Sequence, residues 1–372
     1  MNYQFSVPCL MGVEALVADE LRFNHFADVV AENGKVRFSG DMAECARANV
    51  MLRCGERVLL NLASFRATTF DELFEGVKAI PWADFIGPND AFPVKGYSVS
   101  SKLFSVPDCQ KIVKKAIVER LKLSHGVSWF AEDGCKLQVR FSLLNDRCEI
   151  SLDTTGQPLY KRGYKLETSD ATLRETLAAS IVKVARYRGR ESLIDPFCGS
   201  GTIAIEAALA ALGVSPGARR RFEAEQWGFF DTSVFATARE EAVARERHEK
   251  LPITASDLSP EAVALTEENA RRAGVHDCIT IRRADATKLD FSPWQVMMAN
   301  PPYGVRLLDA EQAHALYAAL GRATQSNPQL KMYVLSSDES FEAHFGRTCD
   351  KKRKLYNGMI KCGLYMYFKN GN

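Results

Sequence analysis

Hydrophobic residues fall into short stretches along the chain, and the spacing of these stretches differs between the first 160 residues and the remainder. In the first part, apolar and polar residues alternate over strand-length segments, which are separated by segments with helical spacing. From residue 164 onward, short runs of consecutive apolar residues are separated by longer helical segments. The change predicts two kinds of fold in one chain, with a boundary near 160–167.

The first part predicts two small α+β units, at residues 1–60 and 61–160. The order in residues 1–60 resembles a ferredoxin-like unit, with strands expected at 3–7, 29–31, 35–39 and 57–62 and helices at 13–21 and 42–50. In residues 61–160 we expect helices at 69–79 and from Asp108 onward, and strands at 91–98, 137–143 and 147–153. The last two strands are joined by the turn-prone pair Asn145-Asp146.

Residues 165–372 predict a larger α/β domain. A helix over 172–186 is followed by five apolar runs separated by helical segments, namely SLIDPF, ITASDL, ITIRRAD, VMMANPP and KMYVLSS. Strands that alternate with helices form a mostly parallel, doubly wound sheet. The end of the chain differs, because residues 351–356 and 359–368 flank the turn sequence Asn357-Gly358 and predict an antiparallel hairpin.

The composition is that of an ordinary soluble globular protein, with 46% hydrophobic and 25% charged residues. The 48 basic and 46 acidic residues leave a net charge of +2, so only local clusters can argue for nucleic-acid binding. The ten cysteines have no CxxC spacing, so we expect reduced thiols in a cytoplasmic protein and no metal site. The chain start lacks a signal-peptide pattern, and the longest apolar segment, 202–214, is too short to span a bilayer.

A loop with two glycines follows the first apolar run of the larger domain. Its sequence is Asp195-Pro196-Phe197-Cys198-Gly199-Ser200-Gly201-Thr202, and residues 203–212 then predict a helix. Glycine permits positive φ and lets the backbone approach a ligand closely where a strand turns into a helix. The loop lacks the third glycine of GxGxxG and the GK[ST] of a phosphate loop. By itself it indicates either a ligand site or a tight strand–helix connection.

Two aspartates end the next two predicted strands. Asp257 ends ITASDL, where a carboxylate can accept hydrogen bonds from both hydroxyls of a ribose. Asp285 ends ITIRRAD, where it suits a donor such as an adenine amine. Each could instead cap the following helix. Together with the glycine loop, they outline a nucleoside-sized cleft at the carboxyl ends of three strands.

The fourth run ends in Asn300-Pro301-Pro302-Tyr303-Gly304. The prolines hold this segment extended and remove two backbone donors, which leaves the Asn300 side-chain oxygen and the Pro301 carbonyl as converging acceptors. Two acceptors that hold the hydrogens of an exocyclic base amine would aim its lone pair at an electrophilic methyl group, without a strong general base. Tyr303 supplies a flat face for stacking an extruded base. The alternative is a plain proline-bearing turn.

These motifs resemble those of class I S-adenosylmethionine-dependent methyltransferases that act on an exocyclic amine. The resemblance rests on DPFCGSGT, SDLSP, the strand ending at Asp285, and NPPYG. PLYKRGY at 158–164 and LRETLAA at 173–179 narrow it to the bacterial RNA methylases that carry a THUMP domain. The best-known function of that family is guanine-N2 methylation of 23S ribosomal RNA. The resemblance covers essentially the whole chain, including the insert 216–227.

The resemblance implies a Rossmann-like methyltransferase domain at 165–372 with an antiparallel C-terminal hairpin, preceded by a ferredoxin-like domain at 1–60 and a THUMP RNA-binding domain at 61–160. It implies S-adenosylmethionine as cofactor, S-adenosylhomocysteine as product, and no metal. Asp257 would bind the ribose, Asp285 the adenine, and Asn300, Pro301, Pro302 and Tyr303 the target base. The other residues implied at the cofactor are Asp195, Pro196, Cys198, Gly199, Ser200, Gly201, Thr202, Glu175 and Thr176. Cys198 is interpreted as a packing residue of this loop and not as a nucleophile.

Local charge favours RNA as the partner. Residues 95–165 hold thirteen Lys and Arg against seven Asp and Glu, a net charge of +6. The residues expected to contact RNA are Lys111, Lys114, Lys115, Lys161 and Arg162, although lysines such as these also suit the solvated face of a helix. A second basic run, 351–354, borders the terminal hairpin and is expected near the mouth of the cleft. No obligate protein partner is indicated.

Other functions fit parts of this pattern. Transfer RNA is an alternative to ribosomal RNA, and NPPY also suits adenine-N6 methylation of DNA. A non-catalytic RNA-binding assembly factor would not need Asp195, both glycines and Asn300 to be intact. A nicotinamide dehydrogenase would need a third glycine and has no use for NPPY.

Overall fold

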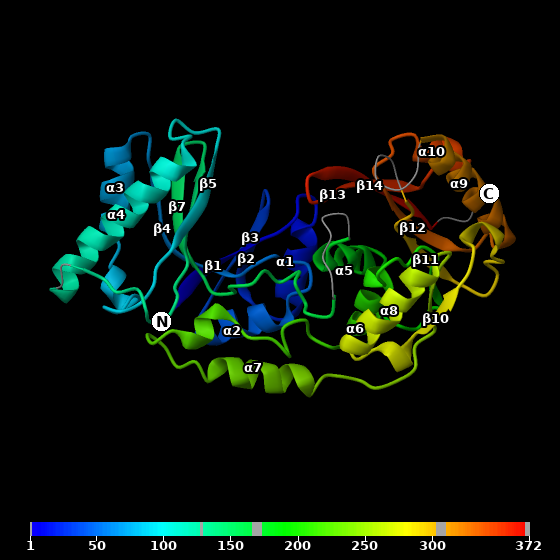
Figure 1. Cartoon of the computed structure of the whole chain (residues 1–372), viewed down its shortest axis with the longest axis horizontal. Coiled ribbons are helices and arrows are strands. Elements are labelled where there is room, and N and C mark those ends of the chain that lie inside the picture. The colour runs from blue at the N-terminus through cyan, green and yellow to red at the C-terminus, as the bar shows by residue number, and fades with distance from the viewer. Residues whose placement is uncertain (1, 127–128, 166–172, 303–309, 369–372) are drawn as a thin grey trace.

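The computed structural model describes residues 2–126, 129–165, 173–302 and 310–368. In these segments the strands form two seven-stranded sheets, which follow one another along the long axis of the molecule (Figure 1). The first sheet belongs to the N-terminal 160 residues and the second to the remainder.

The first sheet has the order β2-β3-β1-β4-β7-β6-β5. Its strands are β1 (Tyr3–Pro8), β2 (Ala27–Glu32), β3 (Lys35–Gly40), β4 (Leu59–Arg66), β5 (Val94–Val99), β6 (Val139–Leu144) and β7 (Arg147–Asp153). Neighbouring strands are antiparallel except for the parallel pair β5 and β6. Strand β4 pairs with β7 from Leu59 opposite Asp153 to Arg66 opposite Arg147. Position 60, where we placed a domain boundary, therefore lies inside a strand that joins both N-terminal units into one sheet.

The helices of this part are α1 (Glu14–Phe23), α2 (Met42–Met51), α3 (Phe70–Lys78), the 3₁₀ helix η1 (Trp82–Asp84) and α4 (Val106–His125). Helix α2 begins with a capping box of Asp41 and Glu44, and α3 begins with one of Thr69 and Glu72. Helix α4 buries one face, with residues Cys109, Val113, Ala116, Ile117 and Leu121 at helical spacing. Its opposite face exposes lysines.

The second sheet has the order β10-β9-β8-β11-β12-β14-β13. Its strands are β8 (Leu193–Asp195), β9 (Ile253–Asp257), β10 (Thr280–Arg283), β11 (Val296–Ala299), β12 (Lys331–Ser336), β13 (Lys351–Asn357) and β14 (Ile360–Tyr367). The first five strands are parallel, and β13 and β14 form the antiparallel hairpin that the sequence predicts. Because the chain runs from β8 first to one side and then to the other, the sheet has a topological switch point beside β8. In such sheets ligands bind at the carboxyl ends of the strands at this point.

The helices of the second part are α5 (Glu175–Val184), α6 (Thr202–Ala211), α7 (Val234–Val243), α8 (Pro260–Arg272), α9 (Ala310–Ala323) and α10 (Phe341–Phe345). Short 3₁₀ helices lie at η2 (Glu223–Gln226), η3 (His276–Cys278), η4 (Ala286–Lys288) and η5 (Thr324–Ser326). None of the helices in the described segments has the length and apolar composition needed to cross a membrane.

A buried polar cluster joins the two parts of the molecule. The Arg162 guanidinium, only 3% exposed, donates to the Arg53 carbonyl and lies 3.4 Å from the Glu206 carboxylate of α6. The Tyr164 hydroxyl donates to the same carboxylate at 3.1 Å, and Arg53 donates to the Val214 carbonyl. Helix α7 also packs on α2, beneath it in Figure 1. Since buried charges need partners, this cluster holds the N-terminal sheet against the second domain.

Candidate active site

The glycine loop connects β8 to α6 at the switch point. Gly199 and Gly201 both have positive φ, at +53° and +80°. A Cβ at Gly201 would lie 2.8 Å from Thr266 Cγ2, so the close packing of α8 requires glycine there. A Cβ at Gly199 would meet no described heavy atom within 4 Å, so this side of the loop faces open space. The loop therefore combines one position fixed by packing with one that a ligand can approach.

Asp195 ends β8 with its side chain buried, at 1% exposure. One carboxylate oxygen accepts a hydrogen bond of 3.3 Å from the Phe197 amide, and the described residues place no cation in an ion pair with it. Burial, with a smaller effect of the nearby Asp257 charge, raises the pKa of Asp195 to about 8. A positively charged ligand group beside Asp195 would restore its ionised form.

Asp257 ends β9, the neighbour of β8, and connects the two strand ends. Its Oδ2 accepts a hydrogen bond of 3.0 Å from the Gly199 amide, and its Oδ1 accepts one of 3.1 Å from the Ser259 amide. The carboxylate is thus oriented by the glycine loop on one side and by the start of α8 on the other. Each oxygen keeps a second lone pair for a ligand hydroxyl.

Asp285 follows β10 and caps the 3₁₀ helix η4. Its Oδ1 accepts from the Thr287 amide at 3.0 Å and from the Thr287 hydroxyl at 2.6 Å, and its Oδ2 lies 3.3 Å from Lys288 Nζ. The Thr287 hydrogen bonds, followed by the Lys288 ammonium, lower the pKa of Asp285. Asp285 therefore does cap the following helix, which was the alternative role left open by the sequence. It does so at the end of β10, the strand next to β9.

The segment after β11 lies on the other side of β8. Asn300 Oδ1 is buried and accepts no hydrogen bond from any residue in the described part of the chain. Leaving a buried acceptor unpaired costs about 1–3 kcal/mol, so the atom is suited to a donor that arrives with a ligand. The Pro302 carbonyl accepts a hydrogen bond of 3.2 Å from the Tyr317 hydroxyl of α9. Tyr303 lies outside the described residues.

Two helices contribute site residues that the sequence analysis missed. On α8, the Thr266 hydroxyl donates to the Gly199 carbonyl and the Asn269 amide donates to the Ser200 carbonyl, both at 2.9 Å. Thr266 and Asn269 are polar residues three positions apart on one helical face, which the sequence shows, but their burial against the glycine loop is visible only in the structure. Tyr317 on α9 is likewise fully buried. These side chains fix the backbone of the two loops.

The remaining predicted cofactor residues lie in two groups. In the loop, Pro196, Cys198 and Thr202 are buried, and burial raises the pKa of the Cys198 thiol, which keeps it protonated at neutral pH. At the start of α5, Glu175 lies 3.5 Å from Lys165 Nζ, and the Thr176 hydroxyl donates to Glu56 at 2.6 Å. Both α5 side chains are thus engaged with other parts of the protein.

The basic residues expected to contact RNA differ in exposure. Lys111, Lys115 and Lys161 are exposed. Lys114 is half-buried, lies 2.6 Å from Glu132 and packs over the ring of Phe92, and this burial lowers its pKa. The donors of Arg162 are used inside the polar cluster described above. We therefore leave Arg162 out of the proposed RNA surface, because its burial removes it from solvent.

The parallel strands, the reversal beside β8 and the C-terminal antiparallel hairpin define a class I methyltransferase fold, and the row of polar groups lies where this class binds its ligands. Three family models match the chain: "RMKL-like, methyltransferase domain" at residues 162–366, "RlmL ferredoxin-like domain" at 4–59, and "THUMP domain" at 67–153. The protein belongs to the RMKL-like methyltransferase family.

Relatives with similar sequences are also named as RNA methyltransferases. The chain is 44% identical to "Putative RNA methyltransferase YpsC" of Bacillus subtilis (strain 168), over 99% of this chain and 96% of that protein. It is 31% identical to "Ribosomal RNA large subunit methyltransferase K/L" of Cellvibrio japonicus (strain Ueda107), over 100% of this chain and 52% of that protein. The chain thus spans about half the length of the K/L relatives that it matches.

Solved structures share the whole fold. A "possible methylase" from Clostridium difficile 630 superposes with a TM-score of 0.96 at 38% identity, covering 100% of this chain and 99% of that one. SMU.472, "a putative methyltransferase complexed with SAH", gives 0.93 at 34% identity with the same coverage. A "predicted N6-adenine-specific DNA methylase" from Listeria monocytogenes gives 0.93 at 40% identity, covering 99% and 96%.

Proposed function

We propose that this protein transfers a methyl group from S-adenosylmethionine to the exocyclic N2 amine of a guanine in 23S ribosomal RNA. The observation that carries the proposal is the buried, unpaired Asn300 Oδ1 at the end of β11, one strand away from the buried Asp195 carboxylate. Among the described residues, an acceptor without a donor and a carboxylate without a cation lie on neighbouring strand ends. They match an amine on one side and a cationic methyl donor on the other.

The residues present fit the cofactor. Asp195 would face its positively charged methionine end, within the loop of Gly199 and Gly201, where the open side of Gly199 leaves room. Asp257 would accept from the ribose hydroxyls, and Asp285 from the adenine amine. When bound, S-adenosylmethionine supplies an electrophilic methyl group. The relative SMU.472, which was crystallised with SAH, supports this assignment.

The chain's own part in the reaction is to hold the amine. The lone pair of a guanine N2 amine is delocalised into the ring, so the nitrogen is a poor nucleophile until its hydrogens are held out of plane. Asn300 Oδ1 and the Pro301 carbonyl would accept these two hydrogens, and Tyr317 fixes the loop through the Pro302 carbonyl. Formation of the new N–C bond would break the methyl–sulfur bond of the cofactor and release S-adenosylhomocysteine. The amine would lose one proton to solvent, because neither acceptor is basic enough to keep it.

RNA as the substrate class is supported by the THUMP match at 67–153 and by the names of the relatives. The assignment of guanine N2 as the methylated atom, and of ribosomal RNA as the polymer, rests on the resemblance and on the names of the K/L relatives. Adenine N6 in DNA, which the Listeria structure's description names, uses the same two-acceptor chemistry. The polymer and the base therefore have to be separated by experiment.

Incubation with labelled S-adenosylmethionine and, in parallel, ribosomal RNA, transfer RNA and DNA tests the proposal. RNA from cells that lack this protein supplies unmodified target sites. We expect label in large-subunit ribosomal RNA and N2-methylguanosine by mass spectrometry of the nucleosides. Label confined to transfer RNA, or N6-methyladenosine in DNA, would replace the proposed substrate. No label in any polymer would overturn the enzymatic function.

Replacing Asp257 with alanine should weaken S-adenosylmethionine binding about 150-fold or more. The change removes two charge-assisted hydrogen bonds to the ribose, each worth about 1.5–3 kcal/mol, and also releases the Gly199 amide. Calorimetric titration measures the effect, with Asp290→Ala, an exposed aspartate that contacts Ser292, as the matched control. Equal affinity of the two variants would remove Asp257 from the cofactor site.

Binding of S-adenosylmethionine should tighten with rising pH between 6 and 7.5. Burial raises the pKa of Asp195 to about 8, so the carboxyl is protonated in this range and must lose its proton to face a cation. Below that pKa, the affinity should rise up to about tenfold per pH unit, with one proton released per cofactor bound. Titrations in buffers of different ionisation enthalpy measure the release. Asp195→Asn should bind more weakly with a flat profile, and a wild-type profile that is equally flat would contradict the assignment.

A further inference from the structure

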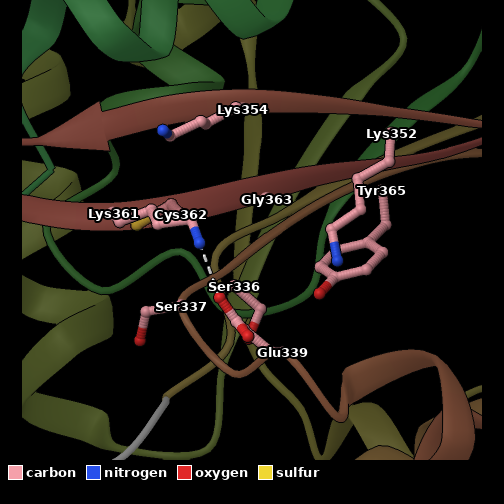
Figure 2. A pocket seen from close by; sticks show the side chains of 9 residues that line it. All are labelled: Ser336, Ser337, Glu339, Lys352, Lys354, Lys361, Cys362, Gly363 and Tyr365. Atoms are coloured by element: carbon pink, nitrogen blue, oxygen red, sulfur yellow. Dashed lines mark hydrogen bonds and ion pairs between the residues drawn. The ribbon is translucent and has the colours of Figure 1, made fainter.

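A basic pocket opens beside the terminal hairpin, at a distance from the glycine loop along the sheet. Its volume is about 290 Å³, and it is formed where β12 ends against β14 and β13. The residues that matter for its chemistry are Ser336, Glu339, Lys352, Lys354, Lys361 and Tyr365. Figure 2 shows Lys361 reaching toward Glu339 and Lys352 lying along the ring of Tyr365. We name it the hairpin pocket.

The hairpin pocket lies next to the segment that would hold the target base. Strands β11 and β12 are parallel neighbours, with Ala299 level with Val334. The pairing ends there, and two residues further along β12 Ser336 lies in the wall of the pocket. Adjacent strands lie about 4.8 Å apart. The wall of the pocket at Ser336 therefore belongs to the strand next to β11, the strand that leads into this segment.

The charge of the hairpin pocket is incompletely balanced. Lys361 Nζ lies 2.7 Å from the carboxylate of Glu339, the one acidic residue among the described residues that line the pocket. Lys352 Nζ lies 4.3 Å from the centre of the Tyr365 ring, and Lys354 Nζ lies 5.3 Å from that of Tyr356. Among the described residues neither Lys352 nor Lys354 forms an ion pair. Three lysines against one glutamate leave two positive charges for an anion.

The backbone of the hairpin gives the pocket its shape. A Cβ at Gly363 would lie 2.8 Å from Lys352 Cε and 3.0 Å from the Tyr365 ring, so glycine leaves room for Lys352 to lie across the ring. On the other side of β13, a Cβ at Gly12 would lie 2.6 Å from the Lys354 carbonyl. Strand β13 thus packs closely on the N-terminal unit, which fixes the lysines relative to the rest of the molecule.

We infer that the hairpin pocket binds a backbone phosphate of the RNA close to the target nucleotide, with Lys354 and Lys361 as its contacts, and that this phosphate displaces Glu339 from Lys361. The inference rests on the proposed function and deepens it. A phosphodiester suits the site because it carries one delocalised negative charge and several acceptor oxygens. Glu339 occupies the position of such an anion in the free protein, since its carboxylate already lies against Lys361. Binding of the phosphate in this pocket would anchor the RNA strand, while the segment after β11 selects the base.

The test compares the double variant Lys354→Ala/Lys361→Ala with Lys331→Ala, an exposed lysine at the opposite end of β12. We expect the double variant to raise the KM for RNA at least about tenfold with a smaller change in kcat, while the dissociation constant of S-adenosylmethionine stays at the wild-type value. The slope of log Kd for RNA against log salt concentration should fall by about 0.7 for one lost phosphate contact. Glu339→Gln should act in the opposite direction and lower the KM for RNA.

The outcomes separate the two proposals. If the wild-type protein methylates RNA and the double variant behaves like Lys331→Ala in KM and salt slope, the pocket inference is wrong and the proposed function stands. A Glu339→Gln variant that raises the KM would show that Glu339 has a supporting role and would overturn its displacement by phosphate. If the wild-type protein methylates no RNA, the proposed function fails and the inference fails with it.

Discussion

Replacing Asn300 with alanine should slow methyl transfer by at least about 100-fold while S-adenosylmethionine binds within a few-fold of its wild-type affinity. Removing one preorganised hydrogen-bonding group at a reacting centre costs about 100- to 1,000-fold in kcat. Here the lost oxygen accepts no hydrogen bond among the described residues, so its removal leaves no described donor without a partner. Single-turnover methylation of RNA measures the rate, and calorimetry measures cofactor affinity.

Asn300→Asp is the matched control for this prediction. It keeps an acceptor oxygen at the same position and should recover part of the lost rate, whereas Asn300→Ala should not. A rate that survives in the alanine variant would show that the amine is held elsewhere. An equal loss of cofactor affinity in both variants would instead place Asn300 in the cofactor site.

Replacing Arg162 with alanine should lower the free energy of unfolding by about 3–5 kcal/mol. Breaking a buried ion pair costs this much because the partner charge is left uncompensated. Glu206 is fully buried, and the hydrogen bond that it keeps among the described residues is the one from the Tyr164 hydroxyl. Chemical denaturation followed by circular dichroism measures the change. The same variant tests the polar cluster that joins the N-terminal sheet to the methyltransferase domain.

Arg221→Ala is the control for this effect. Its guanidinium is 89% exposed and pairs with Glu225 four residues away, an arrangement worth about 0.3–0.5 kcal/mol. Arg162→Met combined with Glu206→Leu should recover part of the stability, since it removes both members of this buried ion pair. If Arg162→Ala cost no more than Arg221→Ala, the cluster would not hold the two parts together.

The strand ends of the second sheet could be predicted from local pattern. Five apolar runs separated by helical segments predict a parallel sheet, and the structure confirms all five as β8 to β12. The positions of Asp195, Asp257 and Asn300 at strand ends follow directly, because parallel strands bring their carboxyl ends to one edge. The hairpin at the end of the chain follows in the same way from Asn357-Gly358.

Burial and long-range pairing could not be read from the same pattern. Arg162 and Lys114 are basic residues in a basic segment, yet one is buried in a polar cluster and the other packs on Phe92. Asp285 has the spacing of a ligand residue and also caps η4. Thr266, Asn269 and Tyr317 support the site from helices whose polar residues gave no sign of which loop they would contact.

The amino-acid sequence by itself determined the elements of this protein and the chemistry carried at each strand end, because side-chain periodicity and turn residues act over a few neighbouring positions. Only the tertiary structure decided that β4 pairs with β7 to merge two units into one sheet, which charged groups are buried, and that three lysines of the hairpin gather around Ser336 and Glu339. These features depend on contacts between residues far apart in the chain. Their energies come from desolvation and charge pairing in the folded state, which no local pattern encodes.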